Sequence, residues 1–104
     1  PRLMLLDEPF AALDEITRRT LADDVLALWS ASRPAIVFVT HNVEEAVYMA
    51  DRVVVLTRGP GRIAGIAKVG GALPRPAGFR TSESFRSAVE EVSHLLAVGM
   101  ETPA

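Results

Sequence analysis

The sequence predicts an α/β fold in which the first strands of the sheet run parallel and an antiparallel hairpin forms the edge. Two observations lead to this class. Short apolar runs of strand length alternate with longer stretches whose apolar residues recur at helical spacing. A valine-rich run is then followed by a glycine–proline turn and a second strand-like run. The resulting order, β-α-β-α-β-β-α, is typical of a partial, mostly parallel sheet that ends in a C-terminal helix.

The first strand and helix are indicated by an apolar run and by capping residues. Leu3–Leu6 is apolar throughout, which predicts a strand buried on both faces of a parallel sheet. A helix is expected over Asp14–Ser32, with Asp14 at the N-cap and Arg33-Pro34 ending it, because the residue before proline is disfavoured in the α region. The predicted apolar face of this helix consists of Ile16, Leu21, Val25, Leu28 and Trp29.

A second strand and helix are indicated in the same way, by an apolar run and capping residues. Ala35–Val39 is a β-rich apolar run, and a short polar turn separates it from a helix predicted over Val43–Ala50. Asn42 and Glu45 have the spacing of a capping box, which marks the start of that helix.

The remainder of the chain is expected to form a hairpin, a linker and a terminal helix. Strands are predicted over Asp51–Thr57 and Arg62–Val69, joined by the turn Arg58–Gly61. Gly70–Arg80 contains proline and glycine and is interpreted as a linker, and Thr81–Val98 as a helix. We therefore expect three regions: a core over 1–69, the linker over 70–80, and a helix with a tail over 81–104.

Composition narrows the classes of function. The formal net charge is −2, which gives no basic surplus for a nucleic-acid partner. Cysteine is absent, which excludes disulfides and thiolate metal sites, and His41 and His94 have no metal-ligand spacing. No apolar run approaches the roughly 20 residues of a membrane span.

Two adjacent carboxylates at the end of the first strand are the candidate metal-binding and catalytic residues. Ligands of open α/β sheets bind outside the carboxyl ends of the strands, where Asp7 and Glu8 are expected. A carboxylate at Asp7 suits Mg²⁺, a hard cation that takes oxygen ligands. Glu8 can then polarise a water aimed at a terminal phosphate. The alternative is that the pair only solvates a loop.

The residues after the pair carry a resemblance to a known family. Leu5–Asp14, reading L-L-D-E-P-F-A-A-L-D, resembles the Walker B strand, catalytic glutamate and D-loop of ABC-transporter ATPases. The resemblance implies a P-loop NTPase fold that binds ATP and Mg²⁺. It also implies that Asp7 holds Mg²⁺ through water, that Glu8 activates the attacking water, and that Asp14 closes the D-loop. Ala11 departs from the pattern, where serine or glycine is frequent.

A second match lies at the end of the next strand. Val37–Asn42, reading V-F-V-T-H-N, resembles the switch (H-loop) strand of the same family. The interval between Asp7 and His41 leaves room for the crossover that a parallel βαβ unit requires. An imidazole at His41 can donate a hydrogen bond to a γ-phosphate oxygen. Taken alone, His41 would be read as an ordinary loop histidine.

The C-terminal part resembles the ATPases of nitrate, sulfonate and taurine importers. The stretches that carry this are Arg58–Ile63 and Leu73–Pro76, followed by a helix. The resemblance implies a subunit that forms a dimer with a second ATPase domain and binds a transmembrane permease, on the cytoplasmic face of the cell membrane. A non-transport ATPase of the same superfamily, acting in DNA repair or chromosome maintenance, is the alternative enzyme.

The phosphate-binding motifs of the family are absent from this sequence. It has no G-x-x-x-x-G-K-[ST] loop and no L-S-G-G-Q signature, and Lys68 is its only lysine. It also opens at Pro1 directly before a strand. We therefore expect a fragment, the C-terminal half of the domain, that is inactive alone and self-associates through strand edges left without partners. A non-catalytic remnant or interaction module is the remaining alternative.

Overall fold

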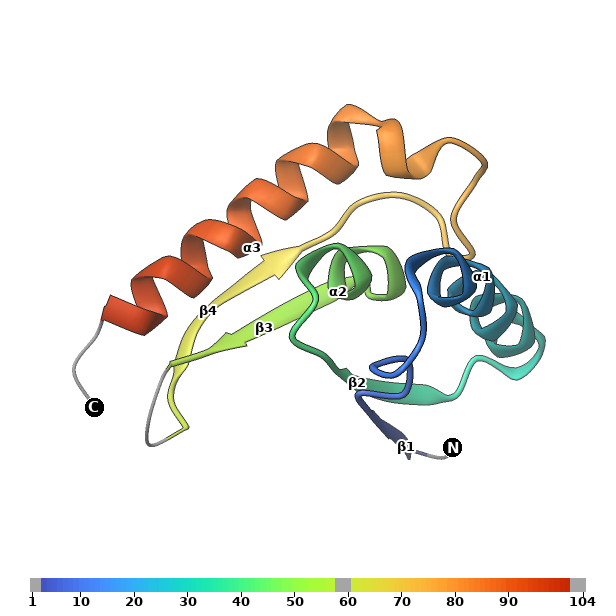
Figure 1. Cartoon of the computed structure of the whole chain (residues 1–104), viewed down its shortest axis with the longest axis horizontal. Coiled ribbons are helices and arrows are strands. Elements are labelled where there is room, and N and C mark those ends of the chain that lie inside the picture. The colour runs from blue at the N-terminus through green and yellow to red at the C-terminus, as the bar shows by residue number, and fades with distance from the viewer. Residues whose placement is uncertain (1–2, 58–60, 102–104) are drawn as a thin grey trace.

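The computed structural model describes residues 3–57 and 61–101, and within them two small sheets and three α-helices (Figure 1). The elements are β1 (Leu3–Asp7), α1 (Glu15–Ser32), β2 (Ala35–Val39), α2 (Val43–Met49), β3 (Arg52–Leu56), β4 (Ile63–Lys68), the short 3-10 helix η1 (Phe79–Thr81) and α3 (Glu83–Glu101). The predicted α/β class and element order are confirmed. The turn predicted at Arg58–Gly61 lies largely outside the described residues.

The strands pair in two separate two-stranded sheets. β1 and β2 are parallel, with Leu3 opposite Ala35 and Asp7 opposite Val39. β3 and β4 form the predicted antiparallel hairpin. The register of the parallel pair matters most for function, because it brings the carboxyl ends of β1 and β2 to the same edge.

The helices begin where local capping predicts. The Asp14 side chain accepts a hydrogen bond from the Thr17 amide at 2.8 Å, and Asn42 accepts one from the Glu45 amide at 2.9 Å. Arg33 ends α1 in a left-handed conformation and donates its amide to the Trp29 carbonyl. Each cap satisfies a backbone group that a helix end leaves without an internal partner.

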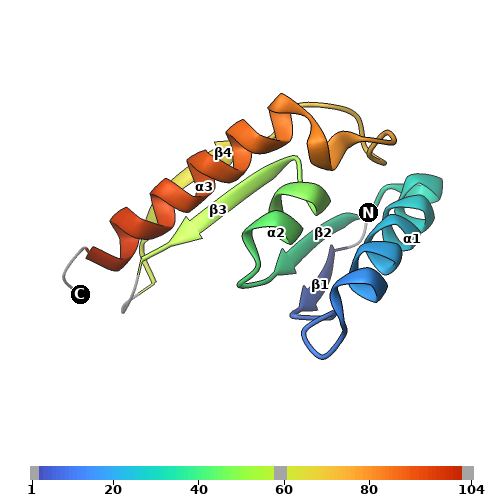
Figure 2. The ribbon, with the colours of Figure 1, turned by 45° about the horizontal axis from the view of Figure 1, so that its top comes forward.

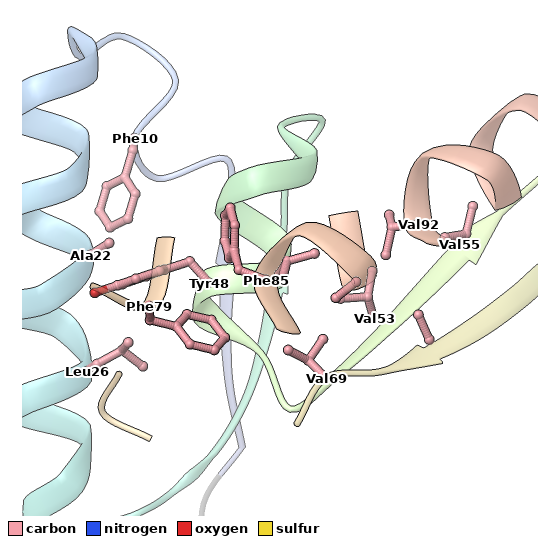
Figure 3. Close-up of a cluster of buried hydrophobic side chains, with 13 residues drawn as sticks. Phe10, Ala22, Leu26, Tyr48, Val53, Val55, Val69, Phe79, Phe85 and Val92 are labelled. Atoms are coloured by element: carbon pink, nitrogen blue, oxygen red, sulfur yellow. The ribbon is translucent and has the colours of Figure 1, made fainter. Parts of the chain in front are cut away.

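The core lies where α2 meets α1, the hairpin and α3 (Figure 2). Tyr48 of α2 packs against Phe79, and Phe79 against Phe85 of α3, with ring centroids 6.1 Å and 5.6 Å apart. Phe10, from the loop after β1, reaches the α1 side of the same cluster (Figure 3). α2 is thus the element on which the other layers converge.

The prediction that Leu3–Leu6 is buried on both faces is wrong. Leu3 is 71% exposed and Leu5 67% exposed. On the neighbouring strand Val37 is 49% exposed and Val39 40% exposed. In the described chain the sheet has only β1 and β2, and the residues that share a face with Leu5 have no layer over them. An apolar run therefore indicates a buried strand only where a second layer exists.

The predicted apolar face of α1 is partly wrong. Ile16 is 80% exposed and Leu28 76% exposed, whereas Ala22 and Leu26 are buried. The buried stripe is the one that turns toward α2, and Ile16 and Leu28 lie off it. In the terminal helix, Phe85 and Val92 are both buried.

Candidate functional site

Glu8 stands immediately beyond β1 in an unusual backbone conformation. Its φ angle is 50°, in the left-handed region that non-glycine residues rarely adopt. Its amide donates to the Val39 carbonyl at 2.8 Å, which extends the parallel ladder by one residue. The turn redirects the chain after Asp7 and points the Glu8 side chain toward the residues that follow β2.

His41 contacts both oxygens of that carboxylate. The His41 amide donates to Glu8 Oε1 at 3.0 Å, and His41 Nδ1 lies 2.7 Å from Glu8 Oε2. Such charge-assisted, two-point contacts are stronger than neutral hydrogen bonds and fix the relative orientation of the groups. The structure therefore joins the two predicted residues that the sequence had placed at the ends of neighbouring strands.

This contact shifts the titration of both groups. The side-chain hydrogen bond to His41 lowers the pKa of Glu8, and the bond to its amide adds to the effect. The same side-chain bond raises the pKa of His41, with smaller help from the charges of Glu8 and Asp7. The charged forms of both partners are thus favoured in the folded chain.

The pH dependence of this pair follows from the signs of the two shifts. A carboxyl with a lowered pKa stabilises the fold above its unfolded value of 4.5 and loses that contribution as the pH falls through its folded pKa. An imidazole with a raised pKa contributes below 6.5 and loses it as the pH rises through its folded pKa. The contribution is therefore complete between pH 4.5 and 6.5.

We expect an NMR titration of the His41 ring to show a midpoint above 6.5 that returns toward this value in Glu8→Gln. Glu44→Gln is the matched control, because it removes a nearby carboxylate that bonds to Arg19 rather than to His41. An unchanged His41 midpoint in Glu8→Gln would contradict the assignment.

A shallow hollow opens beside the pair. Its volume is about 270 Å³, and all but one of the residues around it are polar or charged. The residues around it are Glu8, Ala11, Arg18, Thr40, His41, Asn42 and Glu45. The Thr40 hydroxyl accepts a hydrogen bond from the Asn42 amide at 3.0 Å, which shapes the turn between His41 and α2.

Asp7 and Asp14 occupy different positions from the pair. Asp7 is exposed at the last position of β1, opposite Val39. Asp14 caps α1 and also accepts from the Thr17 hydroxyl at 2.9 Å, and the bond from the Thr17 amide is the main cause that lowers the Asp14 pKa. The structure thus brings Glu8 and His41 together, while Asp14 bonds within its own helix turn.

Asp7, the residue predicted to hold Mg²⁺, is a single exposed carboxylate in the structure. In residues 3–57 and 61–101 no group of three or more His, Asp or Glu side chains could hold a metal ion. Mg²⁺ is commonly held by one or two carboxylates, several waters and phosphate oxygens, and rarely by an all-protein cage. A single exposed carboxylate at Asp7 is compatible with that mode of binding.

Arg18 and Glu45 line the hollow but were not singled out as site residues from the sequence. Arg18 contacts the loop after β1, and Glu45 lies on α2 within 3.6 Å of it. The available signal was the spacing of Arg18 after Asp14, which places it in the first turns of α1 beside the D-loop-like stretch.

Comparison of the amino-acid sequence with known proteins identifies relatives of this chain. No family model matches the chain. It is 46% identical over 96 residues to an uncharacterized ABC transporter ATP-binding protein of Methanocaldococcus jannaschii, a match that covers 92% of this chain and 35% of that protein.

Two further relatives have more specific names. An aliphatic sulfonates import ATP-binding protein of Bacillus cereus is 39% identical over 92 residues, covering 88% of this chain and 36% of that protein. A nitrate import ATP-binding protein of Synechococcus elongatus is 45% identical over 65 residues, covering 62% and 24% respectively. The chain spans about a third of the length of these two ATP-binding proteins, from Methanocaldococcus jannaschii and Bacillus cereus. It belongs to the ATP-binding proteins of ABC transporters.

Proposed function

We propose that this chain supplies the water-activating and phosphate-sensing side of an ATP site in an ABC importer. The observation that supports the proposal most directly is the Glu8–His41 contact at the carboxyl edge of the parallel strands. General-base and switch residues of a nucleotide site have to converge at such an edge. The names of the relatives support import of nitrate, aliphatic sulfonates or a similar small anion.

In this proposal each residue has a separate role. Glu8 accepts a proton from the attacking water, and His41 donates a hydrogen bond to the terminal phosphate. When the phosphate accepts the imidazole hydrogen bond in place of Glu8, one carboxylate oxygen of Glu8 becomes free to accept a hydrogen bond from water. Asp7 would hold Mg²⁺ through water, and the ion would neutralise charge on the phosphates. Asp14 fixes the start of α1 and with it the end of the D-loop-like stretch.

The proposed partners are a second copy of the ATPase domain and a transmembrane permease. The relatives named as import ATP-binding proteins support this assignment. No helix within the described residues is long and apolar enough to cross a bilayer. From the names of these relatives we propose a position at the cytoplasmic face of the membrane, with transport through the permease.

The absence of a phosphate-binding loop from this sequence leads to a direct test. We expect a calorimetric titration of the 104-residue chain with Mg-ATP to show weak binding or none, because no backbone cradle or lysine is present for the phosphates. The intact ATP-binding polypeptide that contains this sequence is expected to bind it. Micromolar affinity in the chain alone would contradict this division of the site.

The uncovered face of the β1–β2 sheet predicts self-association of the chain. Leu5 and Val37 are paired in register on this face, and both are exposed. Contiguous apolar surface of this kind favours association in water. We expect the average mass in light scattering to rise with concentration, and to rise less in Leu5→Lys.

Leu28→Lys is the control for this experiment. Leu28 is 76% exposed, comparable with Leu5, but it lies on α1 rather than on the open sheet. A chain that stays monomeric at high concentration, or an equal response of the two variants, would contradict association through the sheet.

A further inference from the structure

Arg18 lies between the two segments that carry the Glu8–His41 pair. Its Nη2 donates to the Leu13 carbonyl at 2.7 Å and its Nε to the Phe10 carbonyl at 3.4 Å. The same Nε is 3.6 Å from Glu45 Oε2 on α2. One guanidinium therefore contacts both the loop after β1 and the helix after His41.

The loop after β1 needs to be held by its surroundings. Glu8 has a left-handed backbone, which costs free energy and persists only where neighbouring structure imposes it. Inside the loop the Ala11 amide donates to the Glu8 carbonyl at 3.3 Å, and the Leu13 amide to the Phe10 carbonyl at 3.1 Å. Arg18 binds the carbonyls of Phe10 and Leu13 from outside and so fixes both ends of the second of these turns.

The contact with α2 connects Arg18 to the other partner. The Glu45 side chain is only 7% exposed, and a carboxylate removed from water requires a charged or hydrogen-bonding partner. The Glu45 amide is bonded to Asn42, the residue directly after His41. Arg18 therefore reaches the His41 turn through one residue of the first turn of α2.

Arginine suits this position better than lysine. Its planar guanidinium presents several donors in a fixed geometry, whereas an ammonium is a single point of charge. Nη2 donates to the Leu13 carbonyl, while Nε faces both the Phe10 carbonyl and the Glu45 carboxylate, so two positions of the same rigid plane serve the three acceptors.

We propose that Arg18 is a positioning residue that fastens the loop after β1 to α2 and so keeps Glu8 and His41 in contact. The geometric part stands on the contacts of the chain itself. Its consequence for hydrolysis rests on the proposed function.

The test measures amide hydrogen exchange by NMR in the 104-residue chain. The His41 amide donates to Glu8, so its protection reports the contact between the two segments. In Arg18→Gln we expect this amide to exchange about tenfold faster or more, the change that follows from loss of one net hydrogen bond. Amides of the β3–β4 hairpin, which do not contact Arg18, are expected to keep their protection.

Arg19→Gln is the matched control. It removes the same charge from the next residue of the same helix, where Arg19 contacts Glu15 and Glu44 at the surface. Exchange at His41 is expected to be unchanged in it. Equal acceleration in both variants would show a charge effect, and uniform acceleration over the chain would show a general loss of stability. Either result would overturn the proposal.

Glu45→Gln provides a second test should Arg18→Gln not fold. It leaves the carbonyl bonds of Arg18 intact and removes only the charge that links it to α2. Faster exchange at His41, with the Ala11 and Leu13 amides unchanged, supports the proposal. No change at His41 contradicts it.

Hydrolysis by the intact ATP-binding polypeptide separates this inference from the proposed function. Because Arg18 acts on hydrolysis through the Glu8–His41 pair in this proposal, Arg18→Gln is expected to lower kcat while leaving KM for ATP nearly unchanged. If Glu8→Gln leaves hydrolysis intact, the proposed function fails while the exchange result stands. If His41 exchange is unaffected by Arg18→Gln, the positioning role fails whatever the hydrolysis rate.

Discussion

Steady-state ATP hydrolysis by the intact ATP-binding polypeptide is expected to fall by about 10²- to 10⁴-fold on Glu8→Gln, the usual contribution of a positioned general base. Glutamine keeps the shape of the side chain and an oxygen that can accept the His41 amide. It lacks the negative charge and cannot take a proton from water. KM for ATP is expected to change little, because phosphate binding depends on other groups.

Phosphate release measured over a range of ATP concentrations tests this expectation. Glu90→Gln makes the same chemical change on the exposed surface of α3 and is expected to leave kcat unchanged. A Glu8→Gln polypeptide that hydrolyses ATP at the wild-type rate would remove Glu8 from the mechanism and favour a non-catalytic role for this sequence.

Arg75→Ala is expected to lower the free energy of unfolding by about 3 kcal/mol or more, because it leaves several backbone carbonyls in the interior without a hydrogen-bond donor. Arg75 is 8% exposed, and its guanidinium lies 4.4 Å from the centre of the Phe79 ring. It donates to five backbone carbonyls, those of Val47, Tyr48, Ala50, Gly70 and Ala72.

The position of these carbonyls explains the size of the effect. Three of them belong to the C-terminal end of α2, where a helix leaves carbonyls without internal partners and where positive charge is favourable. Each buried acceptor left without a donor costs about 1–3 kcal/mol. The loss would also release the segment between β4 and η1 from α2.

Urea unfolding followed by circular dichroism provides the measurement. Arg75→Lys is expected to recover only part of the loss, since an ammonium cannot reach all the carbonyls that a guanidinium does. Arg86→Ala is the control, because Arg86 is exposed and bonds to one carbonyl at 3.3 Å. Its effect is expected to stay within about 0.5 kcal/mol. An equally small effect of Arg75→Ala would contradict the account.

Features that depend on neighbours in the chain were predictable. Asp14 and Asn42 cap their helices as expected, since a cap involves residues only three positions apart. The hairpin and the terminal helix also follow from local pattern and turn composition. The division of the chain into a core over 1–69, a linker over 70–80 and a helical tail remains a prediction.

Features that depend on a second layer were not predictable from pattern alone. The apolar runs of β1 and of α1 indicate where burial is favourable but not what covers them. Leu5 and Ile16 are exposed because nothing in the described chain packs on them. Arg75 lies in a stretch that composition indicates to be a linker. It is buried because it binds the carbonyls at the C-terminal end of α2.

The sequence by itself determined the family, the element order and the residues that end the two parallel strands. The reason is that two contiguous motifs, recognisable by residue type and spacing alone, contain Asp7, Glu8 and His41. Only the tertiary structure decided that both oxygens of Glu8 bind His41, and that Arg18 bridges their two segments. Those contacts depend on the parallel register of β1 and β2 and on the left-handed turn at Glu8, which arise when distant parts of the chain meet.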